Sequence, residues 1–547
     1  MSSAPSEARS NVRPANEWTI MVFFAGNPHL SPSMTAQLKA IKDAGFQENT
    51  SVLVHYDPNE RGIAVSTFDI NRKRKEDLLN NKQKGTRIGD GKDPFVRNLL
   101  EDAINGATKA DTAEQALRTF LDIGARDEYR AKHYVIFLVG HGVIVGNDAF
   151  LPDSTPQSGI TLEQLGDALR HFKGRLEDDA AFELIGLHSC SMSAIEVIFE
   201  LKDTAKYMMA TQGASFVDSW PYRQLLKKIL NAVDDTKTEE AKDNDQTEVN
   251  VDKLITSIHG LSLHNSTDFI FSGLSADLCL SSLDRNRVEG LRAPIENLAR
   301  DLKRGLKPPP DWDPKKEWRG AEMIKLAHLE AQSYYQETYT DLYDFCLCLR
   351  RRCDNTIPPQ KAMKDACDAV MRALEETADD PVVVQSDHFG PLFQYSHGLS
   401  IFFPWSRPIQ EDPSAIDDTV LNRYEKYEFT KMLGADSWLS FLDDYFTDTQ
   451  RKSREDEDGK PITAPVSGNR PSSGVIGATG AGIVNSLAPV KDSPALAKDS
   501  PSLTDGCGCS VKNYPMRFSI SPRVAEDPNP DATERAKTTQ GVASTRP

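Results

Sequence analysis

Residues 134–146, YVIFLVGHGVIVG, and residues 182–201, FELIGLHSCSMSAIEVIFEL, decide how this chain folds. The first stretch begins as a continuous apolar run and the second as a run that is apolar apart from Glu183, which is typical of strands that are covered on both faces of a parallel sheet. The first run ends in a Gly-His-Gly turn at His141, and the second ends in a turn that presents Cys190. Ligands of open α/β sheets bind at the carboxyl ends of the strands, so we expect both side chains at one site.

The rest of the first half repeats this alternation of strands and helices. A helix at Leu162–Phe172 would join the two strands as a βαβ unit, in which the strands are parallel neighbours. Two more amphipathic segments predict helices, one from near Ser33 to Gly45 and one that begins at Asp111 or Thr112. The pattern predicts an α/β fold, a three-layer sandwich in which helices flank a mostly parallel central sheet. The other strands predicted here are Thr19–Phe24, Ser51–Tyr56, Ile63–Phe68 and Tyr207–Thr211.

Changes in composition divide the chain. Residues 234–252 are acidic and lack apolar periodicity, which predicts an exposed, mobile linker. Beyond residue 450 the chain is rich in Pro, Ser, Thr and Gly and holds too few apolar residues to offset the entropy cost of ordering. The predicted organisation is a flexible tail at 1–16, one folded domain at 17–450 with halves at 17–233 and 253–450, and a mostly disordered tail at 451–547. In the second half, strands are predicted at Asp268–Ser272 and Leu399–Phe403, and helices at Trp318–Arg352 and Gln360–Glu376.

The composition also excludes classes of function. A formal net charge of −17 argues against a nucleic-acid partner, because phosphate backbones select Lys and Arg surfaces, and it suits a basic substrate. No apolar run approaches the roughly 20 residues of a membrane helix. Residues 1–16 hold no stretch typical of a secretory signal, so we expect a cytoplasmic protein with no membrane partner.

The eight cysteines do not predict a disulfide framework in a chain of this length. Cys346, Cys348 and Cys353 cluster in FCLCLRRRC, but no His or second Cys pair lies nearby to complete a zinc site. Buried, reduced thiols are therefore the favoured interpretation, and we expect no metal and no organic cofactor.

His141 and Cys190 together predict a nucleophilic site. A helix expected to begin near Ser191 would place Cys190 at a helix N-terminus, where the backbone dipole favours the reactive thiolate and N–H groups bind an oxyanion. Cys190 follows His141 by 49 residues, and caspases place their histidine about 50 residues before the cysteine. Alone, either residue is better explained by a purely structural role, and it is their occurrence together, in this order and spacing, that favours chemistry. His188 also has the residue type of a general base, but the turn between it and Cys190 gives poor geometry.

At these residues the chain resembles the clostripain-like peptidases, which are relatives of caspases. The resemblance spans about residues 17–450 and includes EWTIMVFFAGNPHL at the first strand, FLVGHG around His141, and the Cys-x-Met-x-x-x-Glu pattern from Cys190 to Glu196. It continues through SWPY, FSGLSADL, YTDLYDF, HGLSIFFP and SWLSFLDDYF. The resemblance implies a caspase-like fold and a cysteine endopeptidase that acts through a Cys–His dyad, usually after Arg or Lys. It also allows calcium as a cofactor, although no calcium loop motif is present.

The residues expected to bind substrate depart from the family pattern. An aspartate usually lies two residues before the nucleophile and helps to hold a basic side chain, but His188 stands there, and an imidazole is a poor partner for a guanidinium. Asp218 is expected to supply the negative charge instead. For Glu196 a helix-surface or ion-pair role is favoured over chemistry. Asp148 and Asp153 would orient His141 or, as we favour, only shape turns.

The expected function is hydrolysis of protein or peptide substrates that carry basic residues, in a cytosolic regulatory role. Control is expected through proteolysis, either by the enzyme itself or by an activating protease. The cut is expected either between His141 and Cys190, where the basic residues are Arg170, Lys173 and Arg175, or, as we favour, in the exposed linker that holds Lys237 and Lys242. Two rivals remain. One is a catalytically silent scaffold that binds partners through the same cleft, and the other is a cysteine acyltransferase, for which no acyl-donor site is found.

Overall fold

The computed structural model describes residues 16–25, 29–44, 47, 49–58, 65–70, 97–98, 112–143, 149–150, 159–176, 180–235, 250–265, 275–335, 337–375, 381–407, 421, 424–431 and 437–452. The predicted tails and the predicted strand Asp268–Ser272 lie outside these residues, with small exceptions. Asn16 already belongs to the first strand, and residues 451–452 end the last helix.

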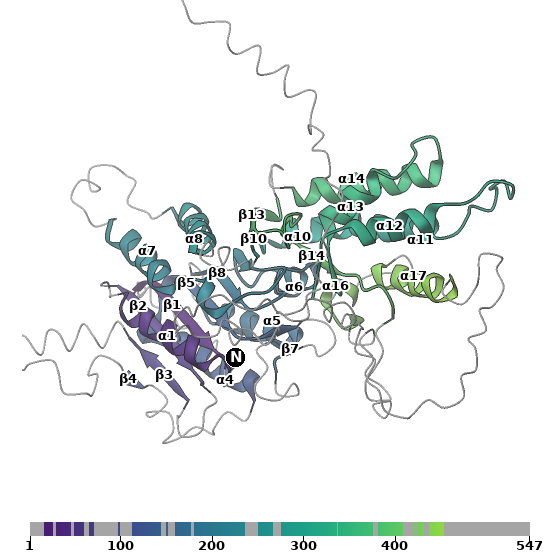
Figure 1. Ribbon diagram of the computed structural model, residues 1–547. Coiled ribbons are helices and arrows are strands. Elements are labelled where there is room, and N and C mark those ends of the chain that lie inside the picture. Colours follow the sequence, from purple (N-terminus) through teal and green to yellow (C-terminus); the bar gives the residue numbers. More distant parts are fainter. Residues whose placement is uncertain are drawn as a thin grey trace, which may run out of the picture.

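A single large sheet dominates the fold (Figure 1). Among the described residues it has nine strands, in the order β13-β10-β9-β8-β5-β1-β2-β3-β4. The five central strands are parallel, and both edges are antiparallel. The strands are β1 (Asn16–Phe24), β2 (Thr50–Tyr56), β3 (Ser66–Asp69), β4 (Arg97–Asn98), β5 (Ala131–Val139), β8 (Ala181–His188), β9 (Tyr207–Ala210), β10 (Ala276–Ser282) and β13 (Val383–Phe389).

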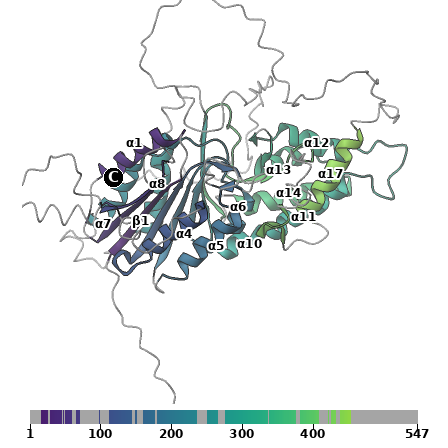
Figure 2. The ribbon, with the colours of Figure 1, turned by 90° about the horizontal axis from the view of Figure 1, so that it is seen from below.

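Helices cover both faces of this sheet, which confirms the predicted three-layer sandwich (Figure 2). The apolar side chains of each central strand point alternately to the two faces, so Ile20 and Val22 join one core and Met21 and Phe23 the other. One face carries α1 (Ser31–Lys42), α7 (Tyr222–Asp235) and α8 (Val251–Asn265), and the other carries α4 (Ala113–Gly124), α5 (Leu162–Lys173) and α6 (Ile195–Leu201).

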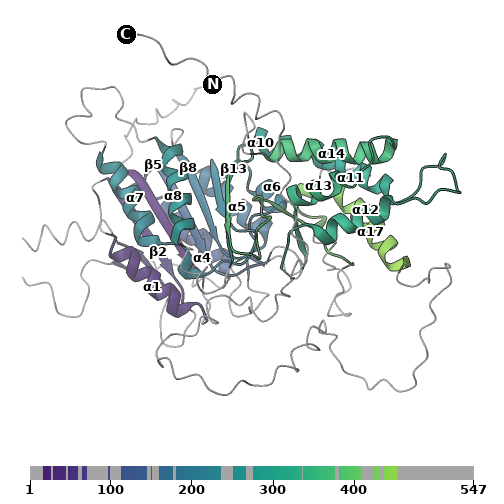
Figure 3. The same cartoon turned by 45° about the horizontal axis from the view of Figure 1, so that its top comes forward.

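The second half of the chain completes the same fold. It supplies β10 and β13 to the large sheet and places a helical layer beside α6 (Figure 3). That layer consists of α10 (Arg285–Gly290), α11 (Arg292–Gly305), α12 (Gly320–Glu330), α13 (Leu342–Arg350), α14 (Pro358–Leu374), α16 (Glu428–Lys431) and α17 (Trp438–Lys452). A small sheet of β11 (Ser333–Tyr334), β12 (Tyr339–Asp341) and β14 (Ser400–Phe402) lies between the two parts.

Several predicted boundaries are wrong. The helix predicted at Trp318–Arg352 is broken into α12, β11, β12 and α13, because Tyr335 and Glu337 adopt φ of 44° and 64°, which a helix cannot contain. The strand predicted at Ile63–Phe68 lies at Ser66–Asp69 and is antiparallel. The ends of the predicted linker belong to α7 and α8, and residues 236–249 lie outside the described residues.

Candidate active site

The two turns predicted to carry chemistry lie side by side at one edge of the sheet. β5 and β8 pair in parallel with Val139 opposite His188, and the Gly140 N–H donates to the His188 carbonyl at 3.4 Å. Two residues further, a Cβ at Gly142 would lie 2.6 Å from the Cys190 carbonyl oxygen. The Gly-His-Gly turn therefore rests directly against the Cys190 turn. Its histidine, His141, is half-buried.

The Cys190 side chain is enclosed by the segment that follows β9. It is 2% exposed. The Ser215 N–H donates to the Cys190 Sγ at 3.4 Å, and the thiol lies 3.7 Å from the Ser215 carbonyl oxygen. The Cys190 carbonyl thus faces the Gly-His-Gly turn, and its thiol contacts the loop that continues to η3 (Val217–Ser219).

Cys190 does not lie at a helix N-terminus, so this prediction is wrong. Helix α6 begins only at Ile195, and Ser191 has a left-handed φ of 57°. The N–H groups of Ser191 and Ser193 donate to Gly213 and Thr211 carbonyls, both at 2.9 Å, instead of starting a helix. The Cys190 turn is consequently an irregular loop held by residues 211–215, and the helix dipole is not its source of polarity.

His188 is buried behind this loop, with partners at both ring nitrogens. Nδ1 lies 3.0 Å from the Tyr222 hydroxyl, and Nε2 lies 2.7 Å from the Phe216 carbonyl oxygen. The ring stacks on Trp220 at a centroid distance of 4.2 Å. His188 therefore belongs to the wall that supports residues 216–222.

Asp218, the acid predicted to bind a basic side chain, is exposed on η3. Its carboxylate accepts hydrogen bonds from the Ser33 hydroxyl at 2.9 Å and from the Gln37 amide at 3.1 Å. Both donors lie on α1, so Asp218 joins the loop beyond Cys190 to that helix. Asp148 and Asp153 lie outside the described residues.

Glu196 has a structural setting that differs from the prediction. Its side chain is fully buried, and it makes no ion pair among the described residues. One carboxylate oxygen accepts the Phe402 N–H at 3.0 Å and the Tyr424 hydroxyl at 2.8 Å. Burial raises the pKa of this carboxyl above its ordinary value. Glu196 thus links α6 to the second half of the chain.

An acid that the sequence did not single out, Asp277, lines a small hollow beside the Cys190 loop. The hollow has a volume of about 10 Å³, room for roughly one water molecule. The carboxylate accepts the N–H groups of Gln212 at 2.5 Å and Gly213 at 3.0 Å. Burial, with a further contribution from Asp341, raises the pKa of Asp277 to about 7. Its place in the FSGLSADL motif was the available signal.

The described part of the chain contains no group of three or more His, Cys, Asp or Glu residues arranged to hold a metal ion. Cys346 and Cys348 are buried free thiols, as predicted, and Cys353 is a half-buried one. No helix in the described ranges is long and apolar enough to cross a membrane.

This caspase-like α/β fold, with a histidine turn and a cysteine turn at one sheet edge, defines a cysteine peptidase class. The chain belongs to the clostripain family (peptidase family C11), whose profile matches residues 22–444. It is a cysteine peptidase, and its substrates are peptides or proteins.

Solved structures of the same family are similar to this chain. One is an inactive zymogen C11 protease from Parabacteroides distasonis, with 16% identity, a TM-score of 0.47, and coverage of 77% of this chain and 99% of that chain. Another is a secreted C11 cysteine protease from Bacteroides thetaiotaomicron, with 12% identity, a TM-score of 0.44, and coverage of 76% and 98%. A second structure of a secreted C11 protease from that organism, in complex with an irreversible peptide inhibitor, has 15% identity, a TM-score of 0.41, and coverage of 78% and 99%.

No curated protein matches the chain. The similar structures contradict one prediction: two of them are described as secreted proteases, which points away from the cytoplasmic location expected from the sequence. The cytosolic regulatory role depended on that location and is withdrawn with it.

Proposed function

We propose that this protein is an endopeptidase in which Cys190 is the nucleophile and His141 is its proton-transfer partner. The observation that carries the proposal is the contact between the two turns, where the Gly142 backbone leaves no room for a Cβ against the Cys190 carbonyl. The thiolate attacks the scissile carbonyl carbon, and backbone N–H groups at the edge of the sheet bind the oxyanion. The C–N bond then breaks as His141 protonates the leaving amine.

The second half of the reaction returns the enzyme to its starting state. A water molecule loses one proton to His141 and attacks the thioester carbon, and the C–S bond breaks to release the Cys190 thiolate and the new carboxylic acid, which loses its proton to solvent. The proton given to the leaving amine and the proton taken from water both pass through His141, and no metal or organic cofactor takes part in a step. Calcium, which the family resemblance allowed, is assigned no role.

The test compares four proteins with a fluorogenic peptide library and a thiol-reactive peptide probe. Cys190→Ala removes hydrolysis and labelling, and His141→Ala lowers hydrolysis by at least about 100-fold. Cys353→Ala is the matched control, because Cys353 is a half-buried thiol of the second half. Wild-type turnover by Cys190→Ala would refute the mechanism. Labelling without hydrolysis in the wild type would favour the silent-scaffold alternative.

The proposed specificity is cleavage after Arg or Lys. It is supported by the net charge of −17, by the family resemblance, and by the exposed Asp218 carboxylate three residues beyond Ser215, which contacts the thiol. Ser33 and Gln37, which donate to Asp218, are uncharged side chains. Asp218→Asn should weaken the basic preference by about 1–3 kcal/mol, the scale of a hydrogen bond to a charged group. A library preference for acidic or apolar residues would contradict this proposal.

A further inference from the structure

Gln212 is a fully buried amide at the end of β9, and all its described side-chain partners lie in the second half of the chain. Its Nε2 donates to the Asp341 carboxylate at 3.0 Å. Its Oε1 accepts the Gly398 N–H at 2.9 Å and the Tyr334 hydroxyl at 3.1 Å. Both polar atoms of the amide therefore have hydrogen-bond partners, and these three partners come from three separate segments of the chain.

These partners are themselves held in place. The Tyr334 hydroxyl also pairs with the Ser396 hydroxyl at 2.7 Å. Asp341 caps α13 by accepting the Asp344 N–H at 2.8 Å, and it accepts the His397 N–H at 2.7 Å. The side chain of Gln212 is thus held by residues of the small sheet and of the segment that leads into β14.

The backbone on either side of Gln212 holds the nucleophile loop. The Thr211 and Gly213 carbonyls accept the N–H groups of Ser193 and Ser191 at 2.9 Å. The Thr211 hydroxyl lies 3.3 Å from the Ser189 carbonyl, and Ser215 contacts the thiol itself. Residues 189–193 are therefore held, before and after Cys190, by hydrogen bonds to residues 211–215, the segment that contains Gln212.

We propose that Gln212 is a positioning residue, through which the second half of the chain sets the position of the Cys190 thiol relative to His141. The inference rests on the proposed function, in which Cys190 is the nucleophile. Gln212 itself touches neither substrate nor thiol. Its effect passes through the neighbouring residues Thr211 and Gly213, whose carbonyls hold the loop around Cys190. A small displacement of the thiol lowers the rate because the near-attack geometry is lost.

The primary test is Gln212→Met, which keeps the length of the side chain and removes its polar atoms. We expect kcat to fall by about tenfold or more while KM stays within about twofold, and the alkylation rate of Cys190 by iodoacetamide to fall in parallel. The matched control is Gln360→Met, because Gln360 is also buried and accepts one backbone N–H, from Asp354 at 2.9 Å. Gln360→Met should lower thermal stability without changing kcat or alkylation of the folded enzyme.

If Gln212→Met fails to fold, a pair of milder substitutions tests the same inference. Tyr334→Phe removes one donor to Gln212, whereas Ser396→Ala removes the other partner of the same hydroxyl and leaves the Gln212 bond. We expect a several-fold loss of kcat, about threefold or more, in Tyr334→Phe alone. Unchanged kcat and alkylation in both Gln212→Met and Tyr334→Phe, or losses that only track the folded fraction, would overturn the inference. Turnover by Cys190→Ala would instead refute the proposed function.

Discussion

At the scale of single residues, Gly142 decides how closely the histidine turn approaches the cysteine turn. A Cβ at this position would lie 2.6 Å from the Cys190 carbonyl oxygen and 2.9 Å from the Met192 sulfur. The flexible Met192 side chain is able to move, but the backbone carbonyl is not. We therefore expect Gly142→Ala to push the turns apart, with a loss of kcat/KM of about tenfold or more and of about 1–3 kcal/mol in the free energy of unfolding.

The control for this substitution is Gly290→Ala. Gly290 ends α10, and nothing lies within 4 Å of the position its Cβ would take. Peptide hydrolysis and urea unfolding would be measured for both variants. Wild-type activity in Gly142→Ala would mean that the contact between the turns does not matter for catalysis.

Asp277 should make stability depend on pH. Its pKa is raised to about 7, mainly by burial and further by Asp341, so the folded state favours the protonated carboxyl. A group of this kind contributes stability that is fully present below its ordinary pKa of about 4 and is lost as the pH rises through about 7. The free energy of unfolding of the wild type, relative to Asp277→Asn, should therefore decrease between pH 5 and pH 8.

Urea unfolding of the two proteins at several pH values measures this difference. Asp365→Asn serves as the control, because that carboxylate is exposed on α14. A difference in unfolding free energy between the wild type and Asp277→Asn that is constant across the range would contradict the raised pKa.

The closeness of the His141 and Cys190 turns was predictable from sequence because its signals are local: an apolar strand followed directly by a turn, twice. Gln212 and Asp277 were not predictable in the same way. Their partners lie between 64 and 186 residues away along the chain, so no short window contains the pattern. The FSGLSADL motif draws attention to Asp277, but the partners of the buried amide and the buried carboxyl become recognisable only in the folded structure.

At the scale of elements, two helix predictions were wrong because backbone groups in these segments pair with other segments of the chain instead of forming a helix. The sequence MSAIEVIFEL after Cys190 has helical periodicity, yet the first turns are lost because residues 191 and 193 bond to the 211–213 segment. In the same way, the apolar pattern of Trp318–Arg352 continues through β11 and β12, which pair with each other instead of forming a helix, and β12 also pairs with β14. Tertiary pairing overrides helix propensity at both places.

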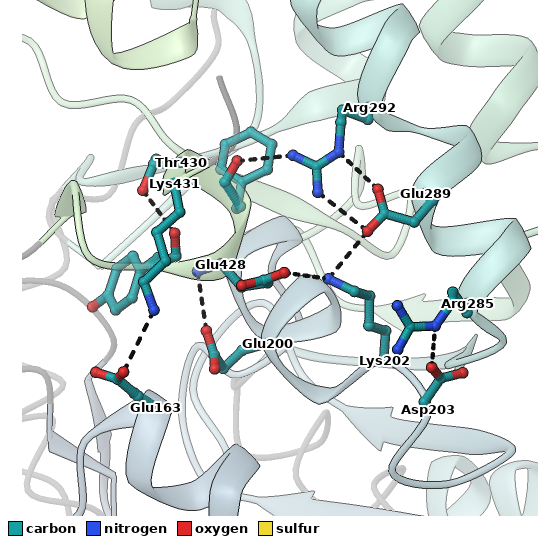
Figure 4. Close-up of polar contacts among 12 residues, drawn as sticks. Glu163, Glu200, Lys202, Asp203, Arg285, Glu289, Arg292, Glu428, Thr430 and Lys431 are labelled. Atoms are coloured by element: carbon teal, nitrogen blue, oxygen red, sulfur yellow. Dashed lines mark hydrogen bonds and ion pairs between the residues drawn. The ribbon is translucent and has the colours of Figure 1, made fainter. Parts of the chain in front are cut away.

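Lys202 joins three of these elements in a charged cluster at the end of α6 (Figure 4). Its ammonium group lies 3.1 Å from Glu289 on α10 and 2.9 Å from Glu428 on α16, and its side chain is only 7% exposed. Removing the Lys202 ammonium group leaves the carboxylates of Glu289 and Glu428 close together without the cation between them. We expect Lys202→Met to lower the free energy of unfolding by about 1–3 kcal/mol.

The same cluster offers a control, Lys431→Met. Lys431 pairs with Glu163 at 3.4 Å, and both side chains are largely exposed, at 42% and 54%. An exposed pair of this kind is worth roughly 0–1 kcal/mol. Chemical denaturation of both variants should show the larger loss for Lys202→Met, and equal losses would contradict the importance of burial here.

At the scale of the whole molecule, the two halves share one sheet and one core. β9, from the first half, pairs with β10, from the second, in a register that joins Ala210 to Cys279. The Ser400 N–H donates to the Ser193 carbonyl at 3.1 Å, and the Ser193 hydroxyl donates to Gly398 at 2.6 Å. The alternation of strands and helices predicted this layering, but it did not show that strands so far apart in sequence become neighbours in one sheet.

This sharing of the sheet predicts the consequence of cutting the chain between Asp235, the last residue of α7, and Val251, the first of α8. We propose that activity is controlled by such a cut, near Lys237 or Lys242, made by the enzyme itself or by an activating protease. The fragments should stay together as one folded particle, because the β9–β10 pairing and the Ser193 contacts cross from one half to the other.

The experiment incubates purified wild type and Cys190→Ala and maps new termini by mass spectrometry. A Lys237→Gln, Lys242→Gln double variant shows whether these two sites are used. Nicked protein should elute as a single species under native conditions and should separate into two fragments only in denaturant, with peptide hydrolysis higher than in intact protein. Fragments from the wild type alone would identify self-processing, and fragments that appear only after addition of another protease would identify an activating enzyme. A chain that stays intact and is fully active would contradict control by cleavage, and halves that separate without denaturant would contradict the shared sheet as the bond between them.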